Sequence, residues 1–281
     1  MKIEKASGIG FCFGARRAID ILEKVARERG GVETLGAVVH NQEVLQRLAG
    51  IGVRVAKNVD DIKGDTVVIS AHGISPQLEE KIHARNVEII DTTCPVVHRA
   101  QLAAQKLAES GFFVAIYGDA EHPEVKGVLG WAKNNGLATL DEKAIAELKP
   151  LPRRLGILSQ TTQIPTRFTE FVKRIIDTAL VKGSEIRIID TICHDIRTRQ
   201  TAALKLAKKV DLMLVIGGHN SANTKHLVEL CSTATKTYLV ENAEEIQPDW
   251  LKNKKHIGIT AGASTDEQTI NEVLTKLEKI A

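Results

Sequence analysis

Short apolar runs alternate with amphipathic stretches along this chain. The segments 66–70, 112–118 and 211–217 each contain a continuous apolar run, at 67–69, 112–117 and 212–216, which is typical of strands buried on both faces of a parallel sheet. The stretch 15–29 instead places apolar residues at helical spacing. This alternation predicts βαβ units, and therefore an α/β fold with mostly parallel sheets.

A long-period repeat is visible around the cysteines. Asp91-Thr92-Thr93-Cys94 recurs 99 residues later as Asp190-Thr191-Ile192-Cys193, and the run 112–118 falls on 211–217 under the same shift. A shift of 82 residues relates Cys12 to Cys94. A helix is expected after each of these cysteines. Repetition at this period indicates three copies of one α/β unit rather than a solenoid.

We therefore predict three similar α/β domains in a pseudo-threefold arrangement around a central iron-sulfur or metal site. Their expected bounds are 1–95, 96–193 and 194–281. The length and the hydrophobic content of 43% supply enough material for several cores. No Pro/Gly/Ser-rich linker marks the joins.

Composition narrows the class of partner. A net charge of +3 and 4% aromatic residues give no basic or stacking surface suited to nucleic acid. No apolar run approaches the roughly 20 residues of a membrane span, and the first residues lack the apolar stretch of a signal peptide. We expect a cytoplasmic protein with reduced thiols that acts on a small molecule.

Three cysteines ahead of helices point to a metal or cluster site. The positive end of a helix dipole favours the thiolate that coordinates metal. No C-x-x-C pair occurs, which argues against zinc ribbons and ferredoxin-type runs. Three ligands leave one corner of a four-iron cluster, or one position on zinc, open to substrate. The alternative is that the cysteines are ordinary core residues, and for Cys231, which lies outside the repeat, we prefer that alternative.

Polar groups recur after the predicted strands and are typical of an anion site. Under the two shifts His40, His122 and Ser221 coincide, while His72 and Ser264 follow other apolar runs. Imidazoles, hydroxyls, amides and backbone N–H groups together suit a diphosphate. The alternative for any single histidine is a helix cap or a bond to a carbonyl.

The middle repeat differs by a carboxylate. Glu124 aligns with Asn223 and is the natural proton donor, and Thr161 and Thr162 in a neighbouring loop offer a hydroxyl relay. A solvated loop glutamate is the alternative.

The motifs resemble the hydroxymethylbutenyl diphosphate reductase family along nearly the whole chain. They are Gly-Phe-Cys12-Phe-Gly, Val-His40-Asn, Ser-Ala-His72-Gly, Asp-Thr-Thr-Cys94-Pro, Glu-His122-Pro-Glu124, Ser-Gln160-Thr-Thr, Asp-Thr-Ile-Cys193, Asn-Ser221-Ala-Asn223 and Ala-Gly-Ala-Ser264. This oxidoreductase family catalyses the last step of the non-mevalonate pathway of isoprene biosynthesis. It reductively removes the hydroxyl of 4-hydroxy-3-methylbut-2-enyl diphosphate, bound at the open iron of a [4Fe-4S] cluster, to give isopentenyl and dimethylallyl diphosphates.

The resemblance also implies residue roles. Cys12, Cys94 and Cys193 would hold the metal cluster, and Glu124, Thr161 and His122 would serve catalysis by delivering protons. The residues implied in substrate binding are His40, His72, His122, Ser221, Asn223 and Ser264. The electron donor would be ferredoxin or flavodoxin.

Three departures from the family pattern stand out. Ala222 replaces a common second serine, Asp195-Ile196 replaces a commoner Ala-Thr, and Asp266 stands where proline is usual. The first removes one hydroxyl from the phosphate loop, so we expect weaker or re-routed substrate contacts. We expect the other two to concern loop shape and to leave every proposed ligand in place.

Two other classes of function fit parts of the sequence. A redox sensor or scaffold would use the cluster without needing Glu124 or the phosphate-type loops. A dinucleotide-binding protein is suggested by Gly8-Ile-Gly10, but Phe13 stands where the G-x-G-x-x-G pattern needs its last glycine.

Overall fold

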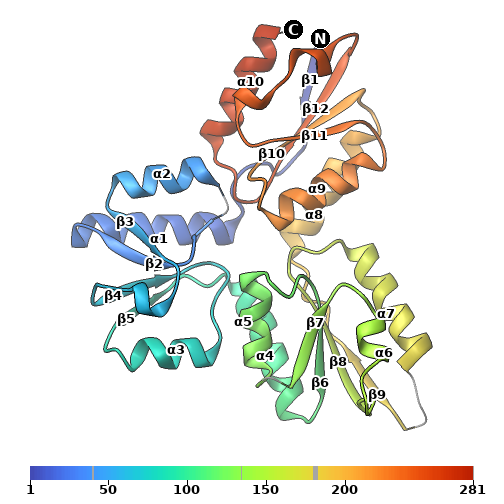
Figure 1. Ribbon diagram of the computed structural model, residues 1–281. Coiled ribbons are helices and arrows are strands. Elements are labelled where there is room, and N and C mark those ends of the chain that lie inside the picture. Colours follow the sequence, from blue (N-terminus) through green and yellow to red (C-terminus); the bar gives the residue numbers. More distant parts are fainter. Residues whose placement is uncertain (40, 134, 180–182, 281) are drawn as a thin grey trace. The chain divides into compact units, whose positions relative to one another are not determined.

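The structure is a computed structural model that describes residues 1–39, 41–133, 135–179 and 183–280. Within these residues the strands form three four-stranded sheets, and each strand pair is parallel. Helices alternate with the strands along the chain (Figure 1). The predicted α/β fold with parallel sheets is confirmed.

All three sheets share one strand order. The first is β3-β2-β4-β5, with β2 Val32–Leu35, β3 Val53–Ala56, β4 Thr66–Ile69 and β5 Glu88–Asp91. The second is β7-β6-β8-β9, with β6 Phe113–Tyr117, β7 Gly136–Thr139, β8 Arg154–Ser159 and β9 Glu185–Ile188. The third is β11-β10-β12-β1, with β10 Leu212–Ile216, β11 Thr237–Val240, β12 His256–Ala261 and β1 Lys2–Lys5. The N-terminal strand thus supplies the fourth strand of the last sheet, which closes the repeat.

The helices begin where the repeat predicts. Each cysteine of the repeat immediately precedes a helix: α1 is Phe13–Arg29, α4 is Pro95–Glu109 and α8 is His194–Ala207. The other α-helices are α2 Gln42–Gly50, α3 Pro76–His83, α5 Pro123–Trp131, α6 Lys143–Ala146, α7 Pro165–Ala179, α9 Ala222–Ser232 and α10 Glu267–Ile280. Short 3-10 turns are η1 Val59–Asp61, η2 Ala243–Glu245 and η3 Pro248–Leu251.

The third sheet is covered on both faces, which explains the uninterrupted apolar sequence of β10. In the third sheet Leu214 packs in a core with Ile270 and Val273 of α10. Val215, one residue later, packs in a separate core with Leu227 of α9. Helices α8 and α9 lie on one side of this sheet and α10 on the other (Figure 1). Since successive side chains point to opposite faces, both must be apolar.

The chain divides into two compact units. One contains Met1–Arg17, Val39–Gly50 and His194–Ala281, and the other contains Ala18–Val38 and Ile51–Cys193. The third sheet belongs to the first unit, and the other two sheets belong to the second. Helix α2 is therefore grouped with the third sheet, although the sequence places it after a strand of the first. The three-domain bounds 1–95, 96–193 and 194–281 stay a prediction.

Candidate active site

The repeated Asp-Thr-x-Cys motif builds the turns that end in Cys94 and in Cys193. Asp91 Oδ1 accepts the N–H of Thr93 at 2.8 Å, and Asp190 Oδ1 accepts the N–H of Ile192 at 3.1 Å. The threonine hydroxyls donate to the ends of the neighbouring strands, Thr92 to the carbonyl of Ile69 and Thr191 to that of Ser159. The motif therefore shapes the loop, and the cysteine is the chemical group that this loop presents.

Each cysteine is also fastened by its own backbone in the same way. The N–H of Cys12 donates to Ala263 O at 2.9 Å, that of Cys94 to Ala71 O at 3.0 Å, and that of Cys193 to Thr161 O at 2.9 Å. Every acceptor lies in the loop that follows the third strand of the same sheet. The threefold repeat thus extends to individual hydrogen bonds, and it links each cysteine to a loop with predicted site residues.

None of these three cysteines forms a disulfide, and all three are half-buried. The N–H of Ala15 donates to Cys12 Sγ at 3.3 Å. For Cys94 we expected the helix start to favour the thiolate, but its pKa is raised. Burial is the largest cause, the N–H groups of Val96 and Val97 act in the expected direction, and the charges of Cys193 and Glu124 raise the pKa further. Burial therefore outweighs the helix start, and a bound metal would have to displace the Cys94 proton.

Cys231 differs from the cysteines of the repeat. It is fully buried within the core on one face of the third sheet. Burial raises the pKa of its thiol to about 12. A thiol that keeps its proton at neutral pH is a poor ligand, which agrees with its assignment as a core residue.

Glu124 and Thr161 form a buried pair. Glu124, at the start of α5, is 2% exposed, and Thr161, which follows β8, is 4% exposed. Glu124 Oε1 accepts the Thr161 N–H at 2.7 Å, and Oε2 accepts the Thr161 hydroxyl at 2.8 Å. Burial raises the pKa of Glu124, although both bonds from Thr161 oppose this. The carboxyl therefore holds a proton at higher pH than an ordinary glutamate, as a proton donor requires.

His72 and His122 lie beside each other in the same unit as this pair. Their ring centroids are 5.4 Å apart in an edge-on arrangement. His122 is the N-cap of α5, and its Nδ1 accepts the N–H of Glu124 at 3.2 Å. In the neutral ring the proton is then on Nε2, so that this nitrogen is a donor. Ser70 Oγ lies 3.3 Å from His72 Nδ1. The capping alternative therefore holds for His122.

Sequence reasoning missed Gln160 as a positioning residue. Its Oε1 accepts the N–H of Asp119 at 3.2 Å, which joins the loop after β8 to the loop that leads to His122. Gly118 makes this approach possible, because a Cβ there would lie 2.8 Å from Gln160 Cβ. Gln160 stood in the quoted motif Ser-Gln160-Thr-Thr without a role of its own, and a glycine recurs four residues before each of His40, His122 and Ser221.

The third sheet presents a second set of polar groups. Ser221 is the N-cap of α9, and its Oγ accepts the N–H of Thr224 at 3.3 Å. Asn223 is 5% exposed, and neither its Oδ1 nor its Nδ2 has a partner among the described residues. Ser264 is half-buried after β12. His40 lies outside the described residues. Because buried polar groups are nearly always satisfied, Asn223 is the residue most in need of a ligand.

A buried arginine, Arg199 on α8, supports the Cys12 loop and was not predicted. Arg199 Nη1 donates to Gly10 O at 2.6 Å, and Nη2 donates to Phe11 O at 3.3 Å. Asp195 pairs with Arg199 Nε at 2.9 Å. We expected Asp195-Ile196 to affect loop shape, and this was wrong, because both residues lie in the first turn of α8.

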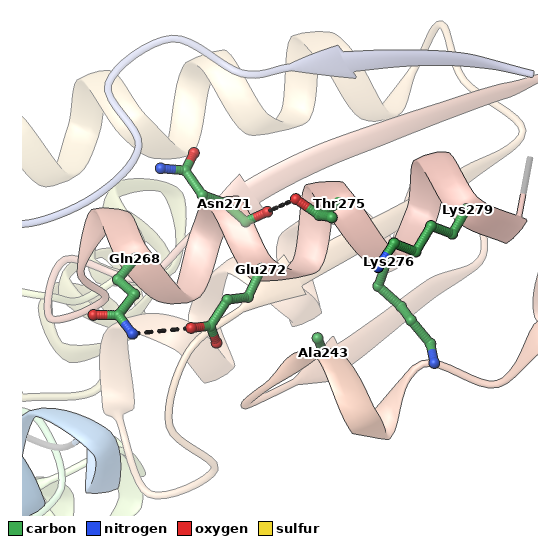
Figure 2. Close-up of a pocket in the computed structure, with 7 residues that line it drawn as sticks. All are labelled: Ala243, Gln268, Asn271, Glu272, Thr275, Lys276 and Lys279. Atoms are coloured by element: carbon green, nitrogen blue, oxygen red, sulfur yellow. Dashed lines mark hydrogen bonds between the residues drawn. The ribbon is translucent and has the colours of Figure 1, made fainter.

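A polar groove runs beside α10, away from these residues. It has a volume of about 660 Å³ and is lined by Gln268, Asn271, Glu272, Thr275, Lys276 and Lys279 of α10 and by Ala243 of η2 (Figure 2). Gln268 Nε2 donates to Glu272 Oε1 at 3.0 Å, and the Thr275 hydroxyl donates to Asn271 O at 2.8 Å. None of the predicted site residues lines this groove.

Comparison with known proteins identifies relatives along the full length. A 4-hydroxy-3-methylbut-2-enyl diphosphate reductase of Dehalococcoides mccartyi is 63% identical over 281 residues, which covers 100% of this chain and 99% of the relative. One from Geobacter metallireducens is 40% identical, with coverages of 100% and 98%.

Solved structures agree with this result. The E-1-hydroxy-2-methyl-but-2-enyl-4-diphosphate reductase of Plasmodium falciparum matches with a TM-score of 0.91 and 27% identity, over 98% of this chain and 87% of that one. A second structure, described as the terminal enzyme of the non-mevalonate pathway, matches with a TM-score of 0.70 and 37% identity, over 99% and 100%.

Among the described residues, no helix is long and apolar enough to cross a membrane.

The family model described as LytB protein matches residues 3–278. The predicted resemblance to a diphosphate reductase family is confirmed by these relatives. This chain belongs to the LytB protein family.

Proposed function

We propose that this protein reduces 4-hydroxy-3-methylbut-2-enyl diphosphate to isopentenyl and dimethylallyl diphosphates. The reaction breaks the C–O bond of the allylic alcohol, consumes two electrons and two protons, and releases water. The buried Glu124–Thr161 pair carries the proposal, because a carboxyl whose pKa is raised by burial keeps its proton to higher pH than an ordinary glutamate, which suits a proton donor. The names of the full-length relatives support the same reaction.

The cofactor in this proposal is a [4Fe-4S] cluster with Cys12, Cys94 and Cys193 as ligands. Half-buried cysteines at helix starts, outside any disulfide, fit such a group. A cluster of this kind supplies the electrons when bound. The residues around the thiols shape the site, since Arg199 fixes the Cys12 loop and the Asp-Thr turns fix the other two.

The diphosphate would be bound by His40, His72, His122, Ser221, Asn223 and Ser264. In support, His122 Nε2 is a donor in the neutral ring, and the Asn223 amide is buried without a partner among the described residues. Neutral donors in a site of low dielectric bind an anion without a neutralising cluster of lysines.

Proton delivery would use the residues of the second sheet. Glu124 holds the proton, and the Thr161 hydroxyl, 2.8 Å from Glu124 Oε2, passes a proton on by accepting one and donating another. His122 lies at the same helix start and is a second candidate for delivery. The reductant would be a small one-electron carrier of the ferredoxin or flavodoxin class, and a cytoplasmic location stays a prediction.

The first test is turnover under anaerobic conditions. Protein purified without oxygen would be mixed with a reduced viologen dye, and oxidation of the dye would be followed after the diphosphate substrate is added. We expect substrate-dependent oxidation and the two allylic and homoallylic diphosphate products. No oxidation by protein that carries its full iron and sulfide would contradict the proposal and favour a redox sensor or scaffold.

A further inference from the structure

Helix α2 is tied to helix α10 by a network that the family resemblance does not anticipate. Thr269 is fully buried on the first turn of α10, and its Oγ1 lies 2.6 Å from Glu43 Oε2 and 2.6 Å from Asp266 Oδ1. A hydroxyl has one proton, so Thr269 donates to one of these carboxylates and lies against the other. Glu43 is on the first turn of α2, 226 residues earlier in the chain.

Asp266 is the centre of this network. It is 6% exposed, and its Oδ1 accepts the N–H of Thr269 at 2.8 Å, so that Asp266 caps the start of α10. Its Oδ2 lies 3.7 Å from Arg47 Nη1 on α2. We expected the presence of Asp266 in place of proline to concern loop shape, and Asp266 does lie in the loop before α10, but its carboxylate also contacts side chains on α2 and α10. A proline has no carboxylate, so the contact with Arg47 and the bonds with Thr269 depend on this exchange.

The two ends of the network lead directly to proposed substrate ligands. Asp266 follows Ser264 by two residues. On the α2 side, Asn41 Oδ1 accepts the N–H of Val44 at 3.1 Å, which fastens the entry of α2 to its first turn. Asn41 follows His40 directly in the sequence, and its Nδ2 is buried with no partner among the described residues.

We infer that Glu43, Thr269 and Asp266 are positioning residues for diphosphate binding, which hold the segment entering α2 in register with the loop that carries Ser264. The inference rests on the proposed function of Ser264 and His40 in substrate binding. Donors that are already ordered bind an anion with a smaller loss of conformational entropy. The network therefore acts on affinity for the diphosphate, and the reducing chemistry itself does not depend on it.

The test compares KM with kcat in variants of the cluster-loaded protein. Thr269→Val removes the hydroxyl and keeps the shape, and we expect KM for the diphosphate substrate to rise about tenfold while kcat changes less than about twofold. Thr269→Ser should restore KM. Asp266→Pro restores the usual family residue and should raise KM in the same way, which keeps the test available if Thr269→Val does not fold.

Coupling and controls complete the test. Glu43→Ala alone, and Glu43→Ala combined with Thr269→Val, should each raise KM by no more than Thr269→Val alone. The two substitutions remove the same interaction, the one between Glu43 and Thr269. Gln46→Ala, an exposed change on the same helix, is the matched control and should leave KM unchanged. An unchanged KM in both Thr269→Val and Asp266→Pro, with wild-type iron content, would overturn the inference. So would a fall in kcat with KM unaltered.

Calorimetry with inorganic diphosphate separates this inference from the proposed function. If wild-type protein binds diphosphate but does not reduce the substrate, the proposed function fails. A weaker Kd in Thr269→Val would then still support positioning. If wild-type protein binds no diphosphate, the positioning role is overturned as well.

Discussion

Glu124 and Asn223 occupy equivalent positions in two repeats and are used in opposite ways. Each lies two residues after the N-cap of its helix, His122 for α5 and Ser221 for α9, and each is buried, at 2% and 5% exposure. Both oxygens of Glu124 are engaged by Thr161, whereas neither polar atom of the Asn223 side chain has a partner among the described residues. In the described part of the chain, the first side chain is satisfied by a neighbour and the second is not.

We propose that this difference separates proton delivery from substrate binding. The cost of burying a polar group is already offset for Glu124 by its hydrogen bonds with Thr161. Among the described residues nothing offsets it for Asn223, so a ligand that satisfied this amide would be favoured. Changes at Glu124 should therefore affect kcat, and changes at Asn223 should affect KM.

The largest effect is expected for Glu124→Gln. The amide retains the shape and can accept one bond from Thr161, but it has no acidic proton to give, so kcat should fall by ~10²–10⁴-fold. Iron content, sulfide content and KM should stay near wild type. The assay is anaerobic dye oxidation at saturating substrate.

The matched control for this change is Glu121→Gln. Glu121 is an exposed carboxylate three residues earlier, paired with Lys126 at 2.7 Å. Its removal should leave kcat unaltered. Near-normal turnover in Glu124→Gln would remove Glu124 from proton delivery.

The next effect in size is expected for Asn223→Asp, which makes the third repeat resemble the second. A carboxylate placed against a diphosphate repels it, so KM should rise by roughly 100-fold while kcat changes little. Asn220→Asp adds the same charge at an exposed position of the same loop and is the control. Equal KM values for the two variants would show that Asn223 does not face the diphosphate.

A smaller effect should appear in the pH dependence of kcat. Because burial raises the pKa of Glu124, its protonated form persists to higher pH, and kcat should fall as pH rises through this raised pKa. The free energy of unfolding should depend on pH in the same direction. The contribution of Glu124 to it is fully present below the pKa of Glu124 in the unfolded state, and it is lost as pH rises through the raised pKa in the folded state.

The substitution Thr161→Val tests whether Glu124 controls the alkaline fall of kcat. In the wild-type protein the hydrogen bond from the Thr161 hydroxyl lowers the pKa of Glu124. Without this bond the pKa should be higher, so the alkaline fall of kcat should move to higher pH. The broken relay should also make kcat itself about tenfold lower. Profiles of kcat against pH for both proteins measure this. An alkaline fall at the same pH would mean that another group controls it.

The sequence predicted the fold well because its signals are local. Uninterrupted apolar runs identified β4, β6 and β10 to within one residue at either end, and the Asp-Thr-x-Cys repeat located the starts of α4 and α8. The contribution of β1 to the third sheet could not be predicted, because strand pairing across 250 residues leaves no trace in a local pattern.

The site was predicted in part for the same reason. Groups with distinctive chemistry, such as Glu124 and the cysteines, were found from their motifs. Arg199, Gln160 and the network of Glu43, Thr269 and Asp266 were missed, because their roles come from partners far away in the sequence. The raised pKa of Cys94 was also missed, since burial cannot be measured from a helix start alone.

The smallest effect is expected for Ala222→Ser, which adds a hydroxyl beside Asn223. Ala222 is the first residue of α9 and is half-buried, so a serine fits there without disturbing the core. If this end of the third repeat binds the diphosphate, one added donor should lower KM by about three- to tenfold at unchanged kcat. Ala222→Val, which adds bulk without a donor, controls for packing and should not lower KM. Because the change adds a contact instead of removing one, a misfolded variant cannot imitate the expected result. A KM that stays at the wild-type value would place the diphosphate away from this helix start, and the contrast between Glu124 and Asn223 would then be one of packing alone.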